Sequence, residues 1–265
     1  MEILQYDFML RALAGGLLAG IICPIIGLFI TLRRMSMISD ALSHVCLSGV
    51  AAGLLVGWQP VLSAATFALG GAFLIEKLRE KYKGYSELSI AIILSAGVAL
   101  AAILIGVGNG FNGSIMSYLF GSIVLITMED IFIMASIGLP VLLLTLCLMK
   151  ELFAITFDEE TAQVGGLPVK LINVGFTALT ALTIAVSLRI VGILLVSSLM
   201  ILPVAAAMQL AKSFMGTIVA AVFIGEVAII IGLCASFYLN LPPGGAIVMT
   251  LVLILIGVLA WRRNF

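Results

Sequence analysis

Long apolar runs alternate with short polar stretches along the whole chain. A helix that crosses a bilayer needs about 20 mostly apolar residues. The pattern predicts about nine membrane-spanning helices, near residues 11–31, 37–57, 60–76, 87–108, 131–149, 171–189, 191–210, 214–237 and 246–261. Segment 114–126 is apolar but too short to cross easily, so we expect a re-entrant or interfacial helix that is buried in protein.

Composition agrees with this pattern. Of the 265 residues, 63% are hydrophobic and only 10% are charged, whereas soluble domains carry about 25% charged residues. We therefore expect an all-α integral membrane protein in which residues 1–265 form a single transmembrane domain surrounded by lipid. The formal net charge of zero gives no reason to expect nucleic-acid binding.

The basic residues predict an orientation, because Lys and Arg gather in cytoplasmic loops. With the N-terminus outside and the C-terminus cytoplasmic, 11 of the 13 basic residues lie inside, and only Arg11 and Arg189 lie outside. The 11 are Arg33, Arg34, Lys77, Arg79, Lys81, Lys83, Lys150, Lys170, Lys212, Arg262 and Arg263. A full crossing by 114–126 would reverse every later loop. For Arg189, near the outer end of a span, we expect snorkelling to the headgroups.

Ionisable residues within the predicted spans are few, and such residues are costly in a bilayer and often functional. His44 is the single histidine, and Asp40 lies one helical turn before it on the same helix face. A carboxylate and an imidazole so placed suit a divalent transition metal. The same pair can instead relay protons, or the two side chains can simply satisfy each other.

Glu226 is a second candidate, because it interrupts the otherwise apolar segment 222–233. It is either a third metal ligand or a gate, or a protonated glutamate bonded to a neighbouring helix. Glu87 is expected at the start of a helix, where a carboxylate suits the N-terminal dipole, and not in a site.

The sizeable hydrophilic segment between two predicted spans is 150–170. It has a helix-like stretch from Asp158 to Val164, which Gly165 and Gly166 would end. A short helix on the inner face is either a docking element or a solvated connector.

Missing motifs narrow the function. The chain has no G-x-x-x-x-G-K-[ST] phosphate loop, so we do not expect it to hydrolyse ATP or to be an enzyme of that kind. It also lacks the G-x-S-x-G and H-E-x-x-H motifs. A single histidine cannot build a histidine-rich metal cage, but a homodimer would bring a second Asp40–His44 pair toward a shared axis.

Residues 33–55, RRMSMISDALSHVCLSGVAAGLL, resemble the signature of metal-ion permease subunits of ABC importers, the zinc/manganese branch called ABC-3. Three later stretches resemble, in order, that family's coupling-helix region, its late core helix, and its last external turn with the final span. They are residues 157–171, 191–206 and 238–248. The resemblance covers nearly the whole chain, and the D-x-L-S-H stretch makes it specific.

The resemblance implies a helical bundle like the vitamin B12-type permeases, working as a homodimer in the bacterial cytoplasmic membrane. Each copy would dock a cytoplasmic ABC ATPase subunit, and an extracellular metal-binding lipoprotein would deliver the ion. The implied ATPase-coupling residues are Phe157, Asp158, Glu159, Glu160, Thr161, Ala162, Gly165 and Gly166.

Asp40 and His44 match the family's acidic and histidine positions on the metal path, and Glu226 is the additional predicted metal residue. Asn240 departs from the aspartate common in the last external turn, so we do not assign it as a ligand.

The sequence therefore predicts a permease that imports a divalent metal, with no permanently bound cofactor. The residues around Asp40 and His44 resemble the zinc members of the family more closely, so zinc is favoured. A manganese or iron permease is the alternative. Two rival functions use the same residues. One is a proton-driven secondary transporter with Asp40, His44 and Glu226 as the relay, and the other is a membrane enzyme with a catalytic metal.

Overall fold

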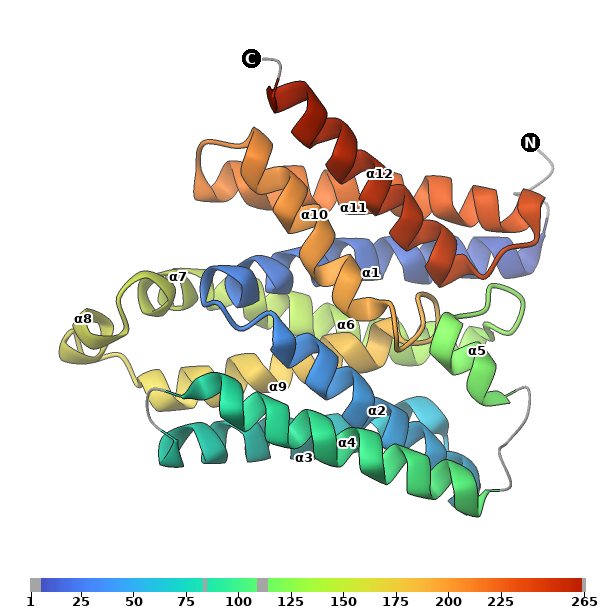
Figure 1. Cartoon of the computed structure of the whole chain (residues 1–265), viewed down its shortest axis with the longest axis horizontal. Coiled ribbons are helices and arrows are strands. Elements are labelled where there is room, and N and C mark those ends of the chain that lie inside the picture. Colours follow the sequence, from blue (N-terminus) through green and yellow to red (C-terminus); the bar gives the residue numbers. More distant parts are fainter. Residues whose placement is uncertain (1–5, 83–84, 109–113, 264–265) are drawn as a thin grey trace.

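The structure is a computed structural model that describes residues 6–82, 85–108 and 114–263, so the predicted basic residue Lys83 lies outside the described residues. Every regular element in these ranges is a helix, and the helices form one bundle (Figure 1). They are α1 (Asp7–Leu32), α2 (Met37–Val56), α3 (Pro60–Lys81), α4 (Ser86–Val107), α5 (Ser114–Phe120), α6 (Met128–Cys147), α7 (Met149–Phe157), α8 (Glu159–Val164), α9 (Val169–Ser187), α10 (Val196–Leu210), α11 (Phe214–Leu239) and α12 (Pro243–Arg263).

Eight of the described helices are long and apolar enough to cross a membrane, namely all except α5, α7, α8 and α10. α10 is also apolar but has 15 residues. With α10 added, the described helices account for the predicted spans, and the all-α membrane bundle is confirmed. Glu87 lies in the first turn of α4, as predicted.

α10 begins later than the predicted span 191–210. After α9 the chain turns, and Gly192 adopts a φ of +87°, a left-handed conformation that favours glycine. The helix resumes only at Val196. The predicted start is therefore wrong, because hydropathy does not register a backbone turn inside an apolar run.

α5 lies within the short apolar segment 114–126. It has seven residues, so it is about 10 Å long and cannot cross a bilayer. Its last carbonyls pair with the turn before α10. The Ile193 amide donates to the Tyr118 carbonyl at 2.9 Å, and the Leu194 amide donates to the Leu119 carbonyl at 3.3 Å. These bonds satisfy main-chain groups that lipid cannot satisfy.

α1 is central to the bundle, and α6, α9, α10 and α11 pack against it. A small residue lets α10 approach closely, since a Cβ on Gly27 would lie 2.0 Å from the Met200 carbonyl oxygen. Phe29 is fully buried against the rings of Phe176 and Phe214. Such close packing, more than exclusion of water, holds helices together in lipid.

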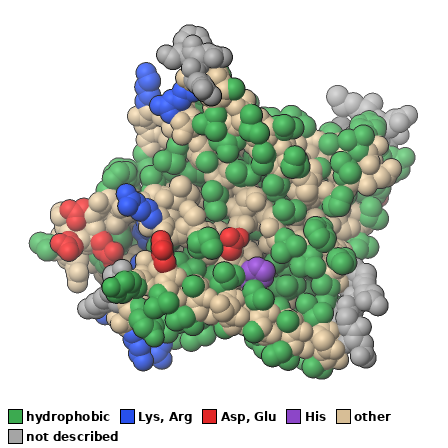
Figure 2. All heavy atoms as spheres, in the orientation of Figure 1, with side chains coloured by type: hydrophobic (Ala, Val, Ile, Leu, Met, Phe, Trp, Pro, Cys, Tyr) green, Lys and Arg blue, Asp and Glu red, His purple; other side chains and the backbone are tan. Residues whose placement is uncertain are grey.

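The bundle has two distinct ends. α1 begins at the end of the bundle where α5 and the α2–α3 turn also lie, and we call this the α5 end (Figure 1). α7, α8 and the turns after α3 and α10 lie at the opposite end, which we call the α8 end. α2 starts further inside the bundle than α7 and α8 do. One face is mostly hydrophobic toward the α5 end, and its charged side chains gather away from that end (Figure 2).

Candidate functional site

Asp40 and His44 lie in the first half of α2. Both side chains are partly exposed, whereas Ala41, Leu42 and Ser43 between them are buried. Figure 2 shows the histidine next to an acidic side chain in this view, with hydrophobic side chains around them. Among the ion pairs of the described residues, none joins Asp40 to His44. No ion pair therefore ties the two side chains to each other, and both remain partly exposed.

α2 is fixed to α3 and α4 by hydrogen bonds one turn after His44. Ser48 Oγ donates to the Gly97 carbonyl of α4 at 2.8 Å, and Ser63 Oγ of α3 donates to the Gly49 carbonyl at 2.6 Å. Interhelical hydrogen bonds of this kind stabilise helix pairs in membranes. Asp40 and His44 thus project from a braced helix, which suits a site that must keep its geometry.

Glu226 lies on α11, half-buried against α1. Its carboxylate occupies the space beside Gly20, where an added Cβ would lie 2.8 Å from Glu226 Oε1. Neither carboxylate oxygen has a hydrogen-bond partner among the described residues. The hydrogen bond from Glu226 to a neighbouring helix, one of the alternatives from the sequence, is therefore not formed among the described residues.

These three residues do not assemble into a metal site within one chain. In the part of the chain that the structure describes, no group of three or more His, Cys, Asp or Glu residues could hold a metal ion. Asp40 and His44 remain together on α2, while Glu226 is on α11. The assignment of all three as metal residues stays a prediction.

α8 is the short helix predicted between Asp158 and Val164. Asp158 caps it, because its carboxylate accepts hydrogen bonds from the Thr161 amide at 3.0 Å and from Thr161 Oγ1 at 2.5 Å. These bonds lower the pKa of the Asp158 carboxyl. Gly166 follows the helix with a φ of +88°. The helix and its glycine stop are confirmed.

Large apolar side chains around α8 are exposed. Phe157 is 64% exposed, Val164 is 90% exposed, and Leu171, just after the connecting loop, is 72% exposed. Of the eight predicted coupling residues, only Ala162 is buried. Apolar side chains exposed among charged ones are typical of a surface that another protein covers.

Polar side chains join α8 to the rest of the bundle. Asn173 Nδ2 of α9 donates to Glu159 Oε1 of α8 at 3.1 Å. Arg33, directly after α1, donates from Nη1 to Asn173 Oδ1 at 2.9 Å and from Nε to Thr156 Oγ1 of α7 at 3.0 Å. Burial lowers the pKa of Arg33 to about 10, and the nearby charge of Arg79 adds to this effect.

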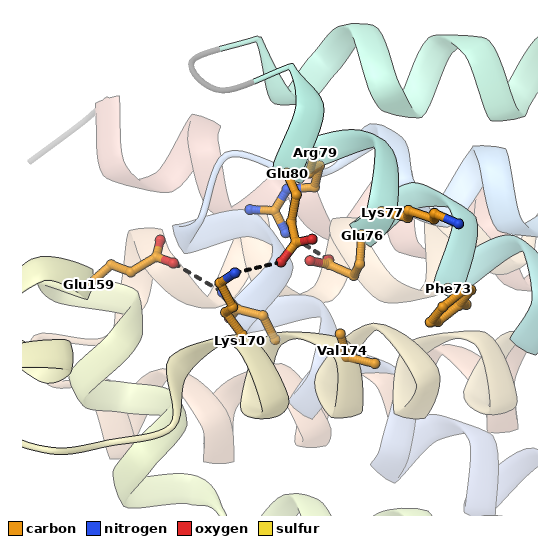
Figure 3. A pocket seen from close by; sticks show the side chains of 9 residues that line it. Phe73, Glu76, Lys77, Arg79, Glu80, Glu159, Lys170 and Val174 are labelled. Carbon is orange, nitrogen blue, oxygen red and sulfur yellow. Dashed lines mark hydrogen bonds and ion pairs between the residues drawn. The ribbon is translucent and has the colours of Figure 1, made fainter.

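A cavity of about 460 Å³ opens between α3, α8 and α9 (Figure 3). On its α3 side Glu76, which is 8% exposed, accepts hydrogen bonds from Arg79 Nη1 and Thr177 Oγ1, both at 2.7 Å. Lys170 of α9 pairs with Glu80 of α3 at 3.0 Å. Because these carboxylates are paired, the polar groups that line the cavity connect α3 to α9. The sequence did not predict this connection.

The Arg189 side chain is bound within the protein instead of extending freely along the span, which contradicts the expected snorkelling. Its Nε donates to Asp130 Oδ2 at 3.1 Å, its Nη2 donates to the Leu125 carbonyl at 3.0 Å, and its guanidinium lies 4.7 Å from the centroid of the Tyr118 ring. The Arg189 and Asp130 side chains are 14% and 6% exposed. The sequence could not show this pairing, because Asp130 begins a different helix.

Asn240 ends α11 at the α5 end. It adopts a φ of +53°, a left-handed conformation that asparagine tolerates better than most residues. With Gly121 and Phe237 it lines a cavity of about 470 Å³. The structure gives Asn240 a helix-ending role.

These features together define a polytopic α-helical membrane protein with a polar pair in its apolar bundle and a short capped helix at one end. The sequence model of the ABC 3 transport family matches residues 5–262, and the chain belongs to this family.

Named relatives match along nearly their whole length. A "Probable metal transport system membrane protein" of Treponema pallidum is 37% identical, over 97% of this chain and 96% of that protein. The manganese transport system membrane protein MntC of Listeria monocytogenes is 34% identical, over 95% of this chain and 90% of that protein.

A solved structure, PsaBC from Streptococcus pneumoniae in complex with a Fab, has a similar fold. It superposes with a TM-score of 0.86 at 30% identity, over 97% of this chain and 92% of that chain. The predicted family and the fold class of an ABC importer permease are confirmed.

Proposed function

We propose that this chain is the membrane permease of an ABC importer that takes up a divalent transition metal. The Asp40–His44 pair carries the proposal, because it offers an oxygen and a nitrogen ligand on a braced helix of an otherwise apolar bundle. Membership of the ABC 3 transport family and the metal-transport names of its relatives support the same function.

The α8 end would face the cytoplasm. Arg33, Arg34 and Lys212 lie in the turns after α1 and α10, and Arg79 and Lys81 lie in the last turn of α3. These parts of the chain lie away from the α5 end. Positive charge in these connections favours a cytoplasmic location. α1 begins at the α5 end, which would put the N-terminus outside, and the extracellular metal-binding lipoprotein would deliver the ion there.

The surface around α8 would dock the ATPase subunit. Phe157 and Val164 are exposed at the α8 end, beside the charged side chains of Glu159 and Glu160. A partner protein that covers these apolar side chains would remove them from water. ATP hydrolysis would then take place on that separate subunit, and its movement would reach the bundle through α8.

A second copy of the chain would complete the ion site. One chain offers the carboxylate of Asp40 and the imidazole of His44, and its described residues include no larger metal-binding group. Two copies related by a twofold axis would supply two carboxylates and two imidazoles. A site built from two half-sites can also come apart, which suits a transporter that must release its ion.

We propose manganese as the preferred transported ion. Relatives such as the MntC protein of Listeria monocytogenes and the manganese import system permease ScaB of Streptococcus parasanguinis are named for manganese. The zinc preference from the sequence stays a prediction, since imidazole and carboxylate ligands accept either ion.

Uptake by reconstituted vesicles tests the function. The chain is incorporated into liposomes with and without the ABC ATPase that co-purifies with it, and Mn²⁺ and Zn²⁺ uptake are measured with and without ATP. We expect uptake that needs both the ATPase and ATP, and a competition series between the two ions identifies the preferred one. Uptake driven by a proton gradient alone would favour a secondary transporter, and would contradict the ABC proposal.

A further inference from the structure

A chain of hydrogen bonds runs from α8 to the turn between α1 and α2. Glu159 on α8 accepts from Asn173 on α9, and Asn173 accepts from Arg33 at the end of α1. We call these three side chains the Asn173 bridge. Asn173 uses its amide nitrogen toward one partner and its amide oxygen toward the other, so it is the joint of the bridge.

The bridge is shielded from solvent at its centre. Asn173 is 7% exposed, and the guanidinium of Arg33 lies 4.8 Å from the centroid of the Phe176 ring. Hydrogen bonds to ionised groups are stronger than neutral ones, and a low local dielectric strengthens them further. The link to Glu159 is at the exposed end, where α8 can be reached from outside the bundle.

The turn after Arg33 is stiff. The Met35 amide donates to the Ile30 carbonyl at 3.0 Å, and the Arg34 amide donates to the Thr31 carbonyl at 3.1 Å, the two bonds of a Schellman motif. Arg34 takes the left-handed position with a φ of +57°. The Ile38 amide then bonds to the Met35 carbonyl at 2.9 Å. A displacement of Arg33 therefore carries over to the start of α2.

α9 is held independently of α8. Thr177, one turn beyond Asn173 on α9, donates to Glu76 of α3. Arg79 donates to the same carboxylate (Figure 3). Because α3 anchors α9 in this way, α9 is not free to follow α8. A movement of α8 then acts on the side chains of the bridge, and Arg33 also bonds to Thr156 of α7, the helix that precedes α8.

From this geometry we infer that the Asn173 bridge transmits movement of α8 to the start of α2, where Asp40 and His44 lie. The inference rests on the proposed function, since it names the route by which ATPase docking would reach the ion site. Glu159, Asn173 and Arg33 are positioning residues in this scheme. They act on the orientation of α2 and do not touch the ion.

The first arm of the test uses the full chain alone in lipid nanodiscs. Hydrogen exchange of the amides in residues 34–39 is compared for the wild type, Glu159→Ala, Asn173→Ala and Glu160→Ala. We expect local opening of the turn to increase exchange about tenfold in the first two variants. Glu160 is the exposed neighbour of Glu159 on α8, and its variant should match the wild type. Unchanged exchange in Asn173→Ala overturns the bridge.

Glu159→Gln separates the hydrogen bond from the charge, because the glutamine carbonyl can still accept from Asn173 Nδ2. Exchange in this variant should stay close to that of the wild type. If Glu159→Gln opens the turn as much as Glu159→Ala does, the hydrogen-bonded route is wrong.

The second arm measures metal ions imported per ATP hydrolysed in vesicles that contain the co-purified ATPase. Asn173 is buried, so Asn173→Ala leaves the docking surface intact, and ATP hydrolysis should continue. We expect Mn²⁺ uptake per ATP hydrolysed to fall about tenfold. A simple loss of stability would lower uptake and ATP hydrolysis together and leave their ratio unchanged. An unchanged ratio overturns the inference.

A wild-type chain without ATP-driven uptake contradicts the proposed function and removes the transport role of the bridge. The exchange arm does not depend on transport, so it still decides whether α8 and the turn are coupled. The two failures are therefore distinguishable.

Discussion

Arg189 and Asp130 form a buried ion pair, with Arg189 Nε 3.1 Å from Asp130 Oδ2, although the two residues belong to segments far apart in the sequence. Asp130 also accepts from the amide and hydroxyl of Thr127, so one carboxylate caps α6 and neutralises the arginine. The pair fastens the start of α6 to the turn that precedes α10.

Removing Arg189 should therefore be costly. Arg189→Ala leaves the Asp130 carboxylate buried without its cation, and breaking a buried pair in this way costs about 3–5 kcal/mol. The exposed Lys170–Glu80 pair is the matched control, and Lys170→Ala should cost no more than about 1 kcal/mol. Equilibrium unfolding in mixed micelles measures both. Equal losses for the two variants would show that the Arg189 pair is not a buried anchor.

Gly121 should not tolerate a side chain. Its φ is +76°, and an added Cβ would lie 2.0 Å from the Ile190 carbonyl oxygen. Overpacking of this kind costs about 1–3 kcal/mol, so Gly121→Ala should lower the free energy of unfolding by at least that amount. Gly257→Ala in α12 is the control, because nothing lies within 4 Å of its added Cβ. It should gain up to about 1 kcal/mol from helix propensity.

Asp40→Ala and His44→Ala should abolish metal uptake while the complex still assembles. Loss of an outer-shell partner already costs about 10–100-fold in metal affinity, so removal of a direct ligand should reduce uptake at least as much. Ser43→Ala is the control on the same helix, since the buried Ser43 hydroxyl has no hydrogen-bond partner among the described residues. Normal uptake by both ligand variants would exclude the Asp40–His44 pair from the ion path.

Glu226→Gln should reduce uptake less than His44→Ala does. The reason is that Glu226 does not join Asp40 and His44 in a metal-binding group within the described part of one chain. The same vesicle assay, with glutamine keeping the shape of the side chain, measures the difference. A loss as deep as that of His44→Ala would support Glu226 as a third ligand.

The Asp158 cap should weaken in acid. Its pKa is lowered by the hydrogen bonds from Thr161, so the cap contributes fully above the unfolded pKa of about 3.9. The contribution is lost as the pH falls through the lowered folded value. Protection of the α8 amides should decrease in that window for the wild type. Asp158→Asn caps without titrating, and a parallel decrease in that variant would contradict this explanation.

The helices of this bundle are predictable because hydropathy and local capping set them. Asp158 and Gly166 lie next to the helix that they delimit, so α8 can be read from a few adjacent residues. The Asp40–His44 pair is readable for the same reason, since helical spacing alone puts both side chains on one face.

Contacts between distant segments are not predictable in this way. Asn173 faces Glu159 and Arg33 only because α1, α8 and α9 meet at one end. Its sequence neighbourhood resembles that of any polar residue near a span end. Arg189 is misread for the same reason, because its partner Asp130 comes from another helix.

The main-chain bonds between α5 and the turn before α10 also constrain how the protein is made. The Tyr118 and Leu119 carbonyls are synthesised long before the Ile193 and Leu194 amides that bond to them. Until α9 has been threaded through the bilayer, these carbonyls need water or the insertion machinery as a partner. α5 should therefore remain at the membrane surface during biogenesis. It should pack against the turn before α10 only after the second half of the chain has been synthesised.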